Sequence, residues 1–233
     1  DRWTFADSFN NWDAAIRAVG SNPRFHDYEH GRFGSAVAFA GDWVVTGAPA
    51  VQTQPTLTVL GGWDFWHEVG AVTFSRPGMQ GGFQVTGHSI ADTGSWLNLG
   101  SLVAGGDGFA AATSGPKRSV LSSTTSSGTP GVLHLFKPLS GSHPWGLART
   151  FDYRDGSWQD YGGGSYPEIH RLANAGVDLM MVRSAGNNSQ VSVLRDVAAH
   201  LAAGTVPPQV RLLEISAHRQ RSRRRLGPPQ PLR

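Results

Sequence analysis

Two segments of the chain repeat the same residue pattern about 66 positions apart, and this repeat limits the accessible folds more than any other feature. Residues 33–49 and 99–114 align with one gap, and a weaker third copy occupies residues 169–182. A fixed period of this size indicates a chain built from similar structural units. The matched pairs are Gly34-Ser35 with Gly100-Ser101, Val37-Ala38 with Val103-Ala104, and Gly41-Asp42 with Gly106-Asp107.

Each copy has the pattern of a β-hairpin, in which a short apolar segment leads to a turn with Gly and Asp and a second apolar segment follows. Gly and Asp tolerate the positive φ that such turns require. The 30 Gly and 14 Pro among 233 residues also indicate many turns between short strands. Further strands are predicted at residues 70–74, 83–90, 131–136, 148–153, 190–194 and 210–215.

Four antiparallel strands per repeat are typical of the blades of a β-propeller. We therefore predict an all-β fold, a propeller-like array of about three to four four-stranded antiparallel blades, with the ring either closed or incomplete. The expected divisions are an N-terminal segment that forms a partial blade, the blades themselves, and a disordered tail. They are placed at residues 1–32, at 33–215 (units 33–98, 99–167 and 168–215), and at 216–233.

Three segments fit this pattern less simply. Residues 3–9 are predicted to be a strand of an incomplete blade, and residues 11–19 a short helix. The apolar spacing of residues 191–201 fits a helix as well as a strand, and we prefer a strand for the first half.

Charge is distributed unevenly along the chain. Residues 210–233 hold seven of the 20 Lys and Arg residues and one of the 17 Asp and Glu residues, so this segment carries +6 and the rest −3. The body therefore lacks the basic character of a nucleic-acid-binding protein, and only the Arg-rich tail suits an anionic partner. A solvated end without a partner is the simpler interpretation of that tail.

Composition and motifs exclude several functional classes. The chain has no Cys, which excludes a disulfide scaffold, a thiolate metal site and a thiol nucleophile. It contains no window of about 18 apolar residues, so we expect no membrane span. The sequence also lacks a Gly-x-Ser-x-Gly elbow, a Walker loop and a dinucleotide-binding glycine motif. We therefore assign no catalytic residues, and an enzymatic function is less favoured than a binding function.

The first copy resembles an FG-GAP repeat, the blade unit of integrin-α-type β-propellers and of many secreted propeller proteins. The resemblance extends over residues 33–195 and is strongest in their first third. The second copy has Leu99 in place of Phe and lacks Gly-Ala-Pro, and the third keeps little beyond its hairpin. The residues that match the motif are Phe33-Gly34, Val37-Ala38, Gly41-Asp42, Gly47-Ala48-Pro49 and residues 70–74.

The resemblance implies a non-enzymatic binding or scaffold module at an extracellular or cell-surface location, as in cell adhesion. Its ligand would be a protein or a glycan held by the blade loops, and its other partners would be further blades of the same or another chain. A glycan-active enzyme with its site in the propeller funnel is the alternative. No signal peptide is recognised at the start of the sequence. Integrin-type propellers have seven blades, so a fragment of a longer propeller is favoured over a short propeller or half of an oligomeric ring.

The motif residues themselves are expected to be structural, because Gly allows close approach at the crowded centre and Pro49 ends a strand. No cofactor is predicted. Many FG-GAP repeats bind calcium through an Asp-x-Asp-x-Asp-Gly loop, but Asp42 and Asp107 are single carboxylates in their hairpins. The sequence therefore resembles the calcium-free type of repeat. Calcium stays open at Asp152, Asp155 and Asp160, although their spacing differs from that loop.

Aromatic residues are concentrated in one long connection. Trp63, Asp64, Phe65 and Trp66 lie between expected strands, and Trp96 lies in a comparable connection. Exposed Trp faces beside a carboxylate suit stacking on sugar rings or anchoring of a protein partner. These five residues are the candidate ligand-binding set, with packing over the blade as the structural alternative.

The best metal candidate is the pair His26 and His30, which are four residues apart with two carboxylates between them. On a helix both imidazoles would share a face and could hold zinc with a third ligand. Pro23 and Gly31 bracket the pair, so a surface loop is the competing and simpler interpretation.

Overall fold

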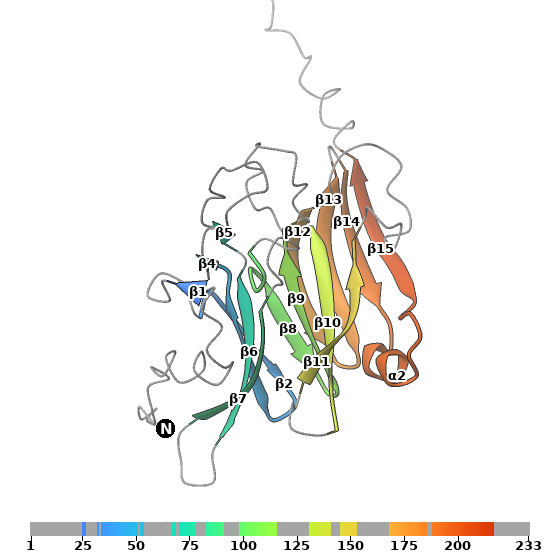
Figure 1. Cartoon of the computed structure of the whole chain (residues 1–233). Helices are drawn as coiled ribbons and strands as arrows, with labels where there is room; N and C mark the ends of the chain where they lie inside the picture. The colour runs from blue at the N-terminus through green and yellow to red at the C-terminus, as the bar shows by residue number, and fades with distance from the viewer. Residues whose placement is uncertain are drawn as a thin grey trace, which may run out of the picture.

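The computed structural model describes an all-β chain (Figure 1). The described residues are 25–26, 32, 34–50, 52–53, 67–68, 70–77, 83–90, 98–115, 131–140, 145–152, 168–185 and 188–216.

Twelve of the strands form three antiparallel four-stranded sheets, each built from strands in chain order. The first sheet contains β2 (Ala36–Ala40), β3 (Trp43–Ala48), β6 (Ala71–Pro77) and β7 (Phe83–Ile90). The second contains β8 (Val103–Gly106), β9 (Phe109–Ser114), β10 (Val132–Pro138) and β11 (Trp145–Phe151). The third contains β12 (Glu168–Ala175), β13 (Asp178–Ala185), β14 (Asn188–Leu194) and β15 (Gln209–Ser216).

The prediction of an all-β fold is confirmed, and the segment predicted as a strand at 83–90 is β7. A small additional sheet joins the two-residue strands β1 (Phe25–His26), β4 (Gln52–Thr53) and β5 (His67–Glu68). Residues 191–201 are divided, because β14 ends at Leu194 and the helix α2 (Val197–Ala202) follows. The elements predicted at residues 3–9 and 11–19 and the tail at 217–233 lie outside the described residues.

The three predicted hairpins are present, and their turns show where the repeats correspond. Strand pairing ends at Ala40 with Trp43, at Gly106 with Phe109, and at Ala175 with Asp178. The turn of the second hairpin is therefore Asp107-Gly108, with the positive φ at Gly108. The gap placed in the alignment of the first two copies is therefore wrong. Gly106 corresponds to Ala40 and not to Gly41, and the offset of 66 residues between the copies continues through the turn.

The second sheet lies between the other two and buries both of its faces. Alternate side chains of a strand point to opposite faces, and in β9 Phe109 and Ala111 pack toward the third sheet while Ala110 and Ala112 pack toward the first. All six residues of β9 are buried. A strand buried on both faces reads as a continuous apolar run, as this segment does.

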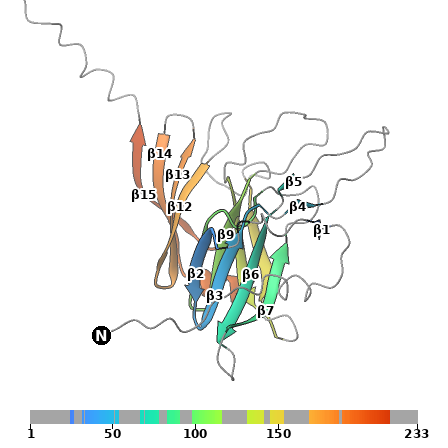
Figure 2. The ribbon, with the colours of Figure 1, turned by 90° about the vertical axis from the view of Figure 1, so that its left-hand side faces the viewer.

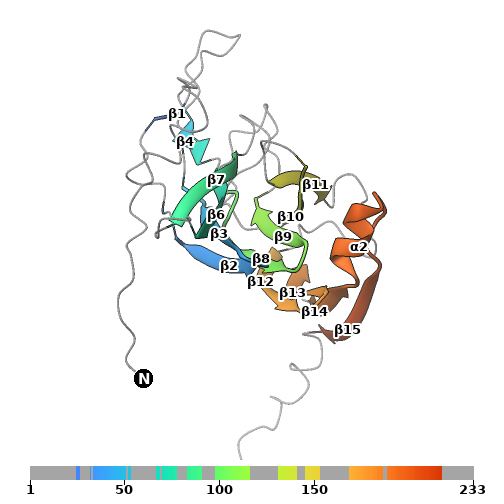
Figure 3. The ribbon, with the colours of Figure 1, turned by 90° about the horizontal axis from the view of Figure 1, so that it is seen from below.

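The sheets converge at their first strands. β8 contacts both β2 of the first sheet and β12 of the third, and Figure 3 shows these three strands gathered together with β7, β11 and β15 at the outer ends of their sheets. The helix α2 contacts β9 and β10 and places Val197 and Leu201 in the core between the second and third sheets. It fills space there because the two sheets diverge away from their first strands (Figures 2 and 3).

The same turn leads into the first and second sheets. Arg32 and Asn98 have φ of 53° and 57°, and in each turn the Ser three residues later donates both its N–H and its hydroxyl to the carbonyl oxygen of that residue. The glycine between them then donates its N–H to the second strand of its own hairpin, Gly34 to Gly47 and Gly100 to Thr113. The Gly-Ser pair of the repeat is thus a turn that fixes the chain entry to each sheet.

Glycines allow the first and second sheets to approach backbone to backbone. A Cβ atom on Gly100 would lie 2.5 Å from the carbonyl oxygen of Ala71 and 2.9 Å from Cα of Gly47. A Cβ atom on Gly105 would overlap the backbone of Phe39. Backbones therefore approach closely at these glycines but not at Gly34 or Gly41, and β3 ends at Ala48 directly before Pro49, as predicted.

Four aromatic rings hold the outer part of the same interface. Phe74 of the first sheet stacks on Trp145 of the second at 5.0 Å between centroids and meets Phe136 edge-to-face at 5.5 Å. Trp43 meets Trp145 edge-to-face at 6.2 Å. Aromatic pairs of this geometry add about 0.5–1.5 kcal/mol each to the burial of their area.

Gly100→Ala should destabilise the protein more than Gly34→Ala. Both glycines have strongly positive φ, 91° and 85°, which costs an L-residue about 1–2 kcal/mol. Only Gly100 also lacks room for a Cβ atom, since nothing lies within 4 Å of one at Gly34. We expect a total loss of about 3 kcal/mol or more for Gly100→Ala, measured by urea unfolding. Equal losses in the two variants would contradict the close contact.

Candidate functional site

The turns of the hairpins β2–β3, β8–β9 and β12–β13 lie at one end of the stack, and several long connections leave from the other. β3 ends at Ala48, β9 at Ser114 and β11 at Phe151, whereas β12 begins at Glu168, all opposite the turns of their hairpins. We call this the loop end of the stack (upper part of Figure 1).

The candidate ligand-binding residues belong to connections that start and finish at the loop end. Trp63 to Trp66 follow β3 and precede β6, and Trp96 follows β7 and precedes β8. The flanking strands reach this end because Ala48 pairs with Ala71, which in turn pairs with Ile90. Trp63, Asp64, Phe65, Trp66 and Trp96 themselves lie outside the described residues.

The side chains of the two metal candidates lie outside the described part of the structure. His26 is the second residue of the short strand β1, its side chain is outside the described part, and His30 lies outside the described residues altogether. Elsewhere in the described ranges, no group of three or more His, Cys, Asp or Glu side chains is close enough to hold a metal ion.

No helix in the described part of the chain combines the length and apolar character that crossing a bilayer requires.

Both sheet interfaces change from apolar to polar toward the loop end. Between the second and third sheets, Leu179 and Met181 on β13 are followed on the same face by Arg183. Arg183 is fully buried, and its Nε donates to Oε1 of Gln190 at 2.9 Å. Sequence reasoning missed this residue, although its alternation with Leu179 and Met181 would have placed it on their face.

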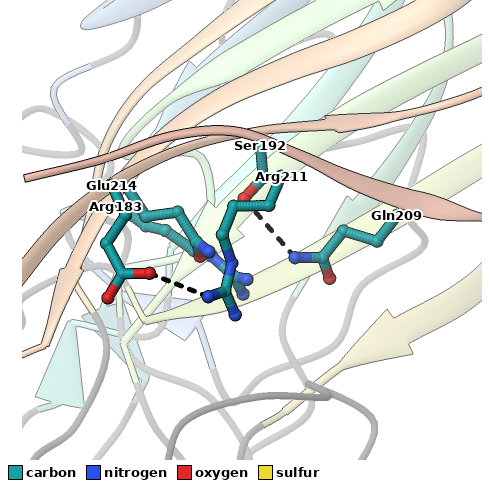
Figure 4. A network of polar contacts seen from close by, with 6 residues as sticks. Arg183, Ser192, Gln209, Arg211 and Glu214 are labelled. Atoms are coloured by element: carbon teal, nitrogen blue, oxygen red, sulfur yellow. Dashed lines mark hydrogen bonds and ion pairs between the residues drawn. The ribbon is translucent and has the colours of Figure 1, made fainter.

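The polar face of the third sheet continues across β14 to β15 (Figure 4). Ser192 pairs with Arg211 and Gln190 with Glu214 in the strand register, so their side chains share the face of Arg183. Arg211 donates to Oε2 of Glu214 at 2.8 Å, and Gln209 donates to the hydroxyl of Ser192 at 3.4 Å. Arg211 and Glu214 are each 40% exposed in their side chains, so they can contact a ligand, whereas Arg183 is too deep to do so.

His134 occupies the corresponding polar position between the first and second sheets. Its Nε2 lies 2.8 Å from the hydroxyl of Ser114 and its Nδ1 lies 3.1 Å from the hydroxyl of Thr150. Burial lowers the pKa of His134 from 6.5 to about 4, because an imidazolium would lose its hydration there. The neutral ring is therefore a structural link across β9, β10 and β11.

A separate carboxylate fixes the connection from β14 to α2, at the hairpin end. The Asp178 carboxylate accepts a hydrogen bond from the backbone N–H of Asp196 at 2.8 Å and forms an ion pair with Arg195. The backbone hydrogen bond from Asp196 and the Arg195 side chain hold the pKa of Asp178 below its ordinary value. Because Asp196 has a φ of 47°, this contact holds a strained residue directly before the helix.

The polar face carries exposed groups that can contact a ligand. Glu214 is the one carboxylate on the described polar face of the third sheet, and it is paired with Arg211. The exposed guanidinium of Arg211 and the amide of Gln209 can donate hydrogen bonds to a ligand oxygen.

His134 should make the protein less stable in acid. Above pH 6.5 the ring is neutral in both states, but between pH 6.5 and about 4 only the unfolded chain takes up the proton. The free energy of unfolding should therefore fall by about 3 kcal/mol over this range through His134. In urea unfolding series, His134→Gln should show a shallower pH dependence, and an unchanged slope would refute the assignment.

Arg183→Ala should cost far more stability than Arg211→Ala, although each removes one positive charge. The first leaves a cavity and deprives buried Gln190 of its donor, an effect of about 3 kcal/mol. The second removes an exposed ion pair, which is worth about 0.5 kcal/mol. Thermal and urea unfolding of both variants measure the difference. Similar losses would mean that the polar face is not buried in solution.

Comparison of the chain with protein-family models, with curated proteins and with solved structures finds no match. Any function must therefore be inferred from the stacked sheets, the loop end and the sequence motifs.

Proposed function

We propose that this protein is an array of FG-GAP-like β-propeller blades that serves as a non-enzymatic binding or scaffold module outside the cell or at its surface. The observation that carries the proposal is the stacking of three four-stranded meanders that meet through their first strands. Neighbouring blades of a propeller are arranged in this way, with the first strand of each nearest the axis.

The roles of the motif residues support the family assignment. In the first copy the N–H of Gly34 donates to the carbonyl oxygen of Gly47, so the Phe-Gly turn is tied to the Gly-Ala-Pro strand. In the second copy Gly100 makes the equivalent bond to Thr113, although Gly-Ala-Pro is missing there. In both copies a backbone hydrogen bond thus ties the Gly-Ser turn to the second strand of its own sheet, which supports a structural role for the motif.

The proposed binding surface is the loop end of the stack. Rigid sheets support loops, and binding residues in repeat folds lie mainly in such loops. The connections that hold Trp63, Asp64, Phe65, Trp66 and Trp96 are flanked by strands that end there. Aromatic faces beside a carboxylate favour a glycan ligand, because sugar rings stack on Trp and their hydroxyl groups donate to carboxylates.

The test is binding of the purified chain to immobilised neutral and acidic polysaccharides. The double variant Trp63→Ala/Trp66→Ala should reduce glycan binding at least tenfold, since it removes two stacking faces. Leu147→Ala is the control, because Leu147 is an exposed apolar residue on β11 outside the proposed set. Equal binding by all three proteins would contradict the loop assignment. Release of shorter sugars from the polysaccharide would instead favour the enzymatic alternative.

A further inference from the structure

The outer face of the third sheet, on the side away from the second sheet, is apolar and open. Val210 and Leu213 on this face are 41% and 52% exposed. Monomeric proteins rarely leave a continuous apolar patch in water, so this face is a candidate contact surface. Of the six apolar residues that β13, β14 and β15 place there, Val193 alone is buried. The six are Met180, Val182, Val191, Val193, Val210 and Leu213.

The same face of the other two sheets is covered by the sheet that follows. Counted back from the hairpin turns, Ala173 and Met180 correspond to Ala104 and Ala111 of the second sheet. Ala104 and Ala111 lie in the core between the second and third sheets. Among the described four-stranded sheets, only the third has this face uncovered, and the surface that covers it elsewhere is the face of another sheet.

The other end of the stack is not free to receive this face. On the side of the first sheet away from the second sheet, Thr46, Thr73 and Ser75 are 4%, 2% and 2% exposed. That side is therefore already covered within the chain, and its exposed Val37 and Phe39 are confined to the edge strand β2. Each copy of the chain thus offers one open apolar sheet face, so two copies can join such faces only as a symmetric pair.

We propose that two copies of this chain associate through the outer faces of their third sheets, packed face to face about a two-fold axis. Such a contact is self-complementary and closes at two copies. With strands about 4.8 Å apart and a rise of about 3.3 Å per residue, this four-stranded face has an area of about 500 Å². Two faces bury about 1,000 Å², which reaches the lower limit for a specific interface. The inference uses the stacked sheets alone and does not depend on the ligand of the loop end.

The charges of the third sheet also favour association through this face. Glu168 and Arg171 of β12 are the charged residues that the strand register places on it, and their charges are opposite. Two copies of the face therefore carry no net charge that would repel them. The free edge of the sheet is less suited, because β15 carries the charged pair of Arg211 and Glu214. Charged side chains on an edge strand oppose pairing with another strand.

The test is the mass of the purified chain in solution, by light scattering and sedimentation over a range of concentrations. The wild-type protein should reach a mass of about 50 kDa, twice the 24.9 kDa of one chain, and should not exceed it. Leu213→Asp buries a charge from each copy in the contact and should weaken dimerisation at least tenfold. Val210→Asp should do the same from a second position, which keeps the test valid if one variant folds poorly.

Leu147→Asp is the matched control, because Leu147 is 53% exposed on the second sheet. This variant should leave the dimer intact, and circular dichroism should show the same β-structure in all the variants compared. A dimer that both Leu213→Asp and Val210→Asp leave unchanged would overturn the proposal.

A single introduced cysteine tests the symmetry of the contact, since the chain has no Cys of its own. Val191 lies on β14, one of the two central strands of the sheet, so in a symmetric pair it should lie near its own counterpart. A short bis-maleimide should join Val191→Cys into a covalent dimer and should leave Leu147→Cys as single chains. A dimer that Phe39→Asp disrupts and that Val191→Cys does not cross-link would show contact with the first sheet, and it would overturn the proposal.

Other outcomes separate this dimer from the proposed function. A monomer with a β-rich spectrum and intact glycan binding would overturn the dimer and leave the proposed function standing. Masses that grow without limit as concentration rises would show an open chain of copies, which also overturns the symmetric pair. A dimer of the expected mass that is sensitive to Leu213→Asp but binds no glycan would support the interface and count against the proposed ligand.

Discussion

The close approach of backbones between the first and second sheets is the constraint on which the rest of the structure depends. Gly47 and Gly100 meet without room for a Cβ atom, and Gly105 lies directly against the backbone of Phe39. Because these contacts are short, the sheets must diverge outward, and larger side chains fill the widening space. Phe74, Phe136 and Trp145 fill it between the first and second sheets, whereas α2 helps to fill it between the second and third. A Cβ atom on Gly100 or Gly105 would overlap the backbone of the first sheet and push the two sheets apart there.

The third sheet packs on the second sheet differently from the way the first sheet does. Its strands present Leu179, Met181 and Leu194 to the second sheet. The six residues of α2 are too few to be stable alone, so the burial of Val197 and Leu201 and the hydrogen bond from Lys137 to the carbonyl oxygen of Leu201 stabilise it. The weak sequence similarity of the third copy therefore accompanies a real change in packing.

Local features could be predicted from the sequence, whereas features set by stacking could not. The hairpins follow from strand, turn and strand within about 15 residues, and β7 at 83–90 lies where its pattern predicts. The alignment gap beside Gly106 was wrong because glycines on either side of Asp107 are indistinguishable without the pairing of Gly106 with Phe109. Arg183 resembles a solvated charge in the sequence, and only the second sheet makes it a buried residue. The helix α2 is too short to establish a period.

The polar ends of both interfaces connect the packing to the proposed function. A fully apolar interface would be the more stable choice, since burying His134 and Arg183 costs solvation that their partners only partly restore. Both residues lie toward the loop end, where their hydrogen bonds join neighbouring strands at fixed positions: His134 links β9 to β11, and Arg183 links β13 to β14. Directional bonds define strand ends more sharply than apolar contacts, which permit small slips. A surface made of loops can recognise a ligand only if the strand ends beneath it are fixed, so the polar groups belong at this end of the stack.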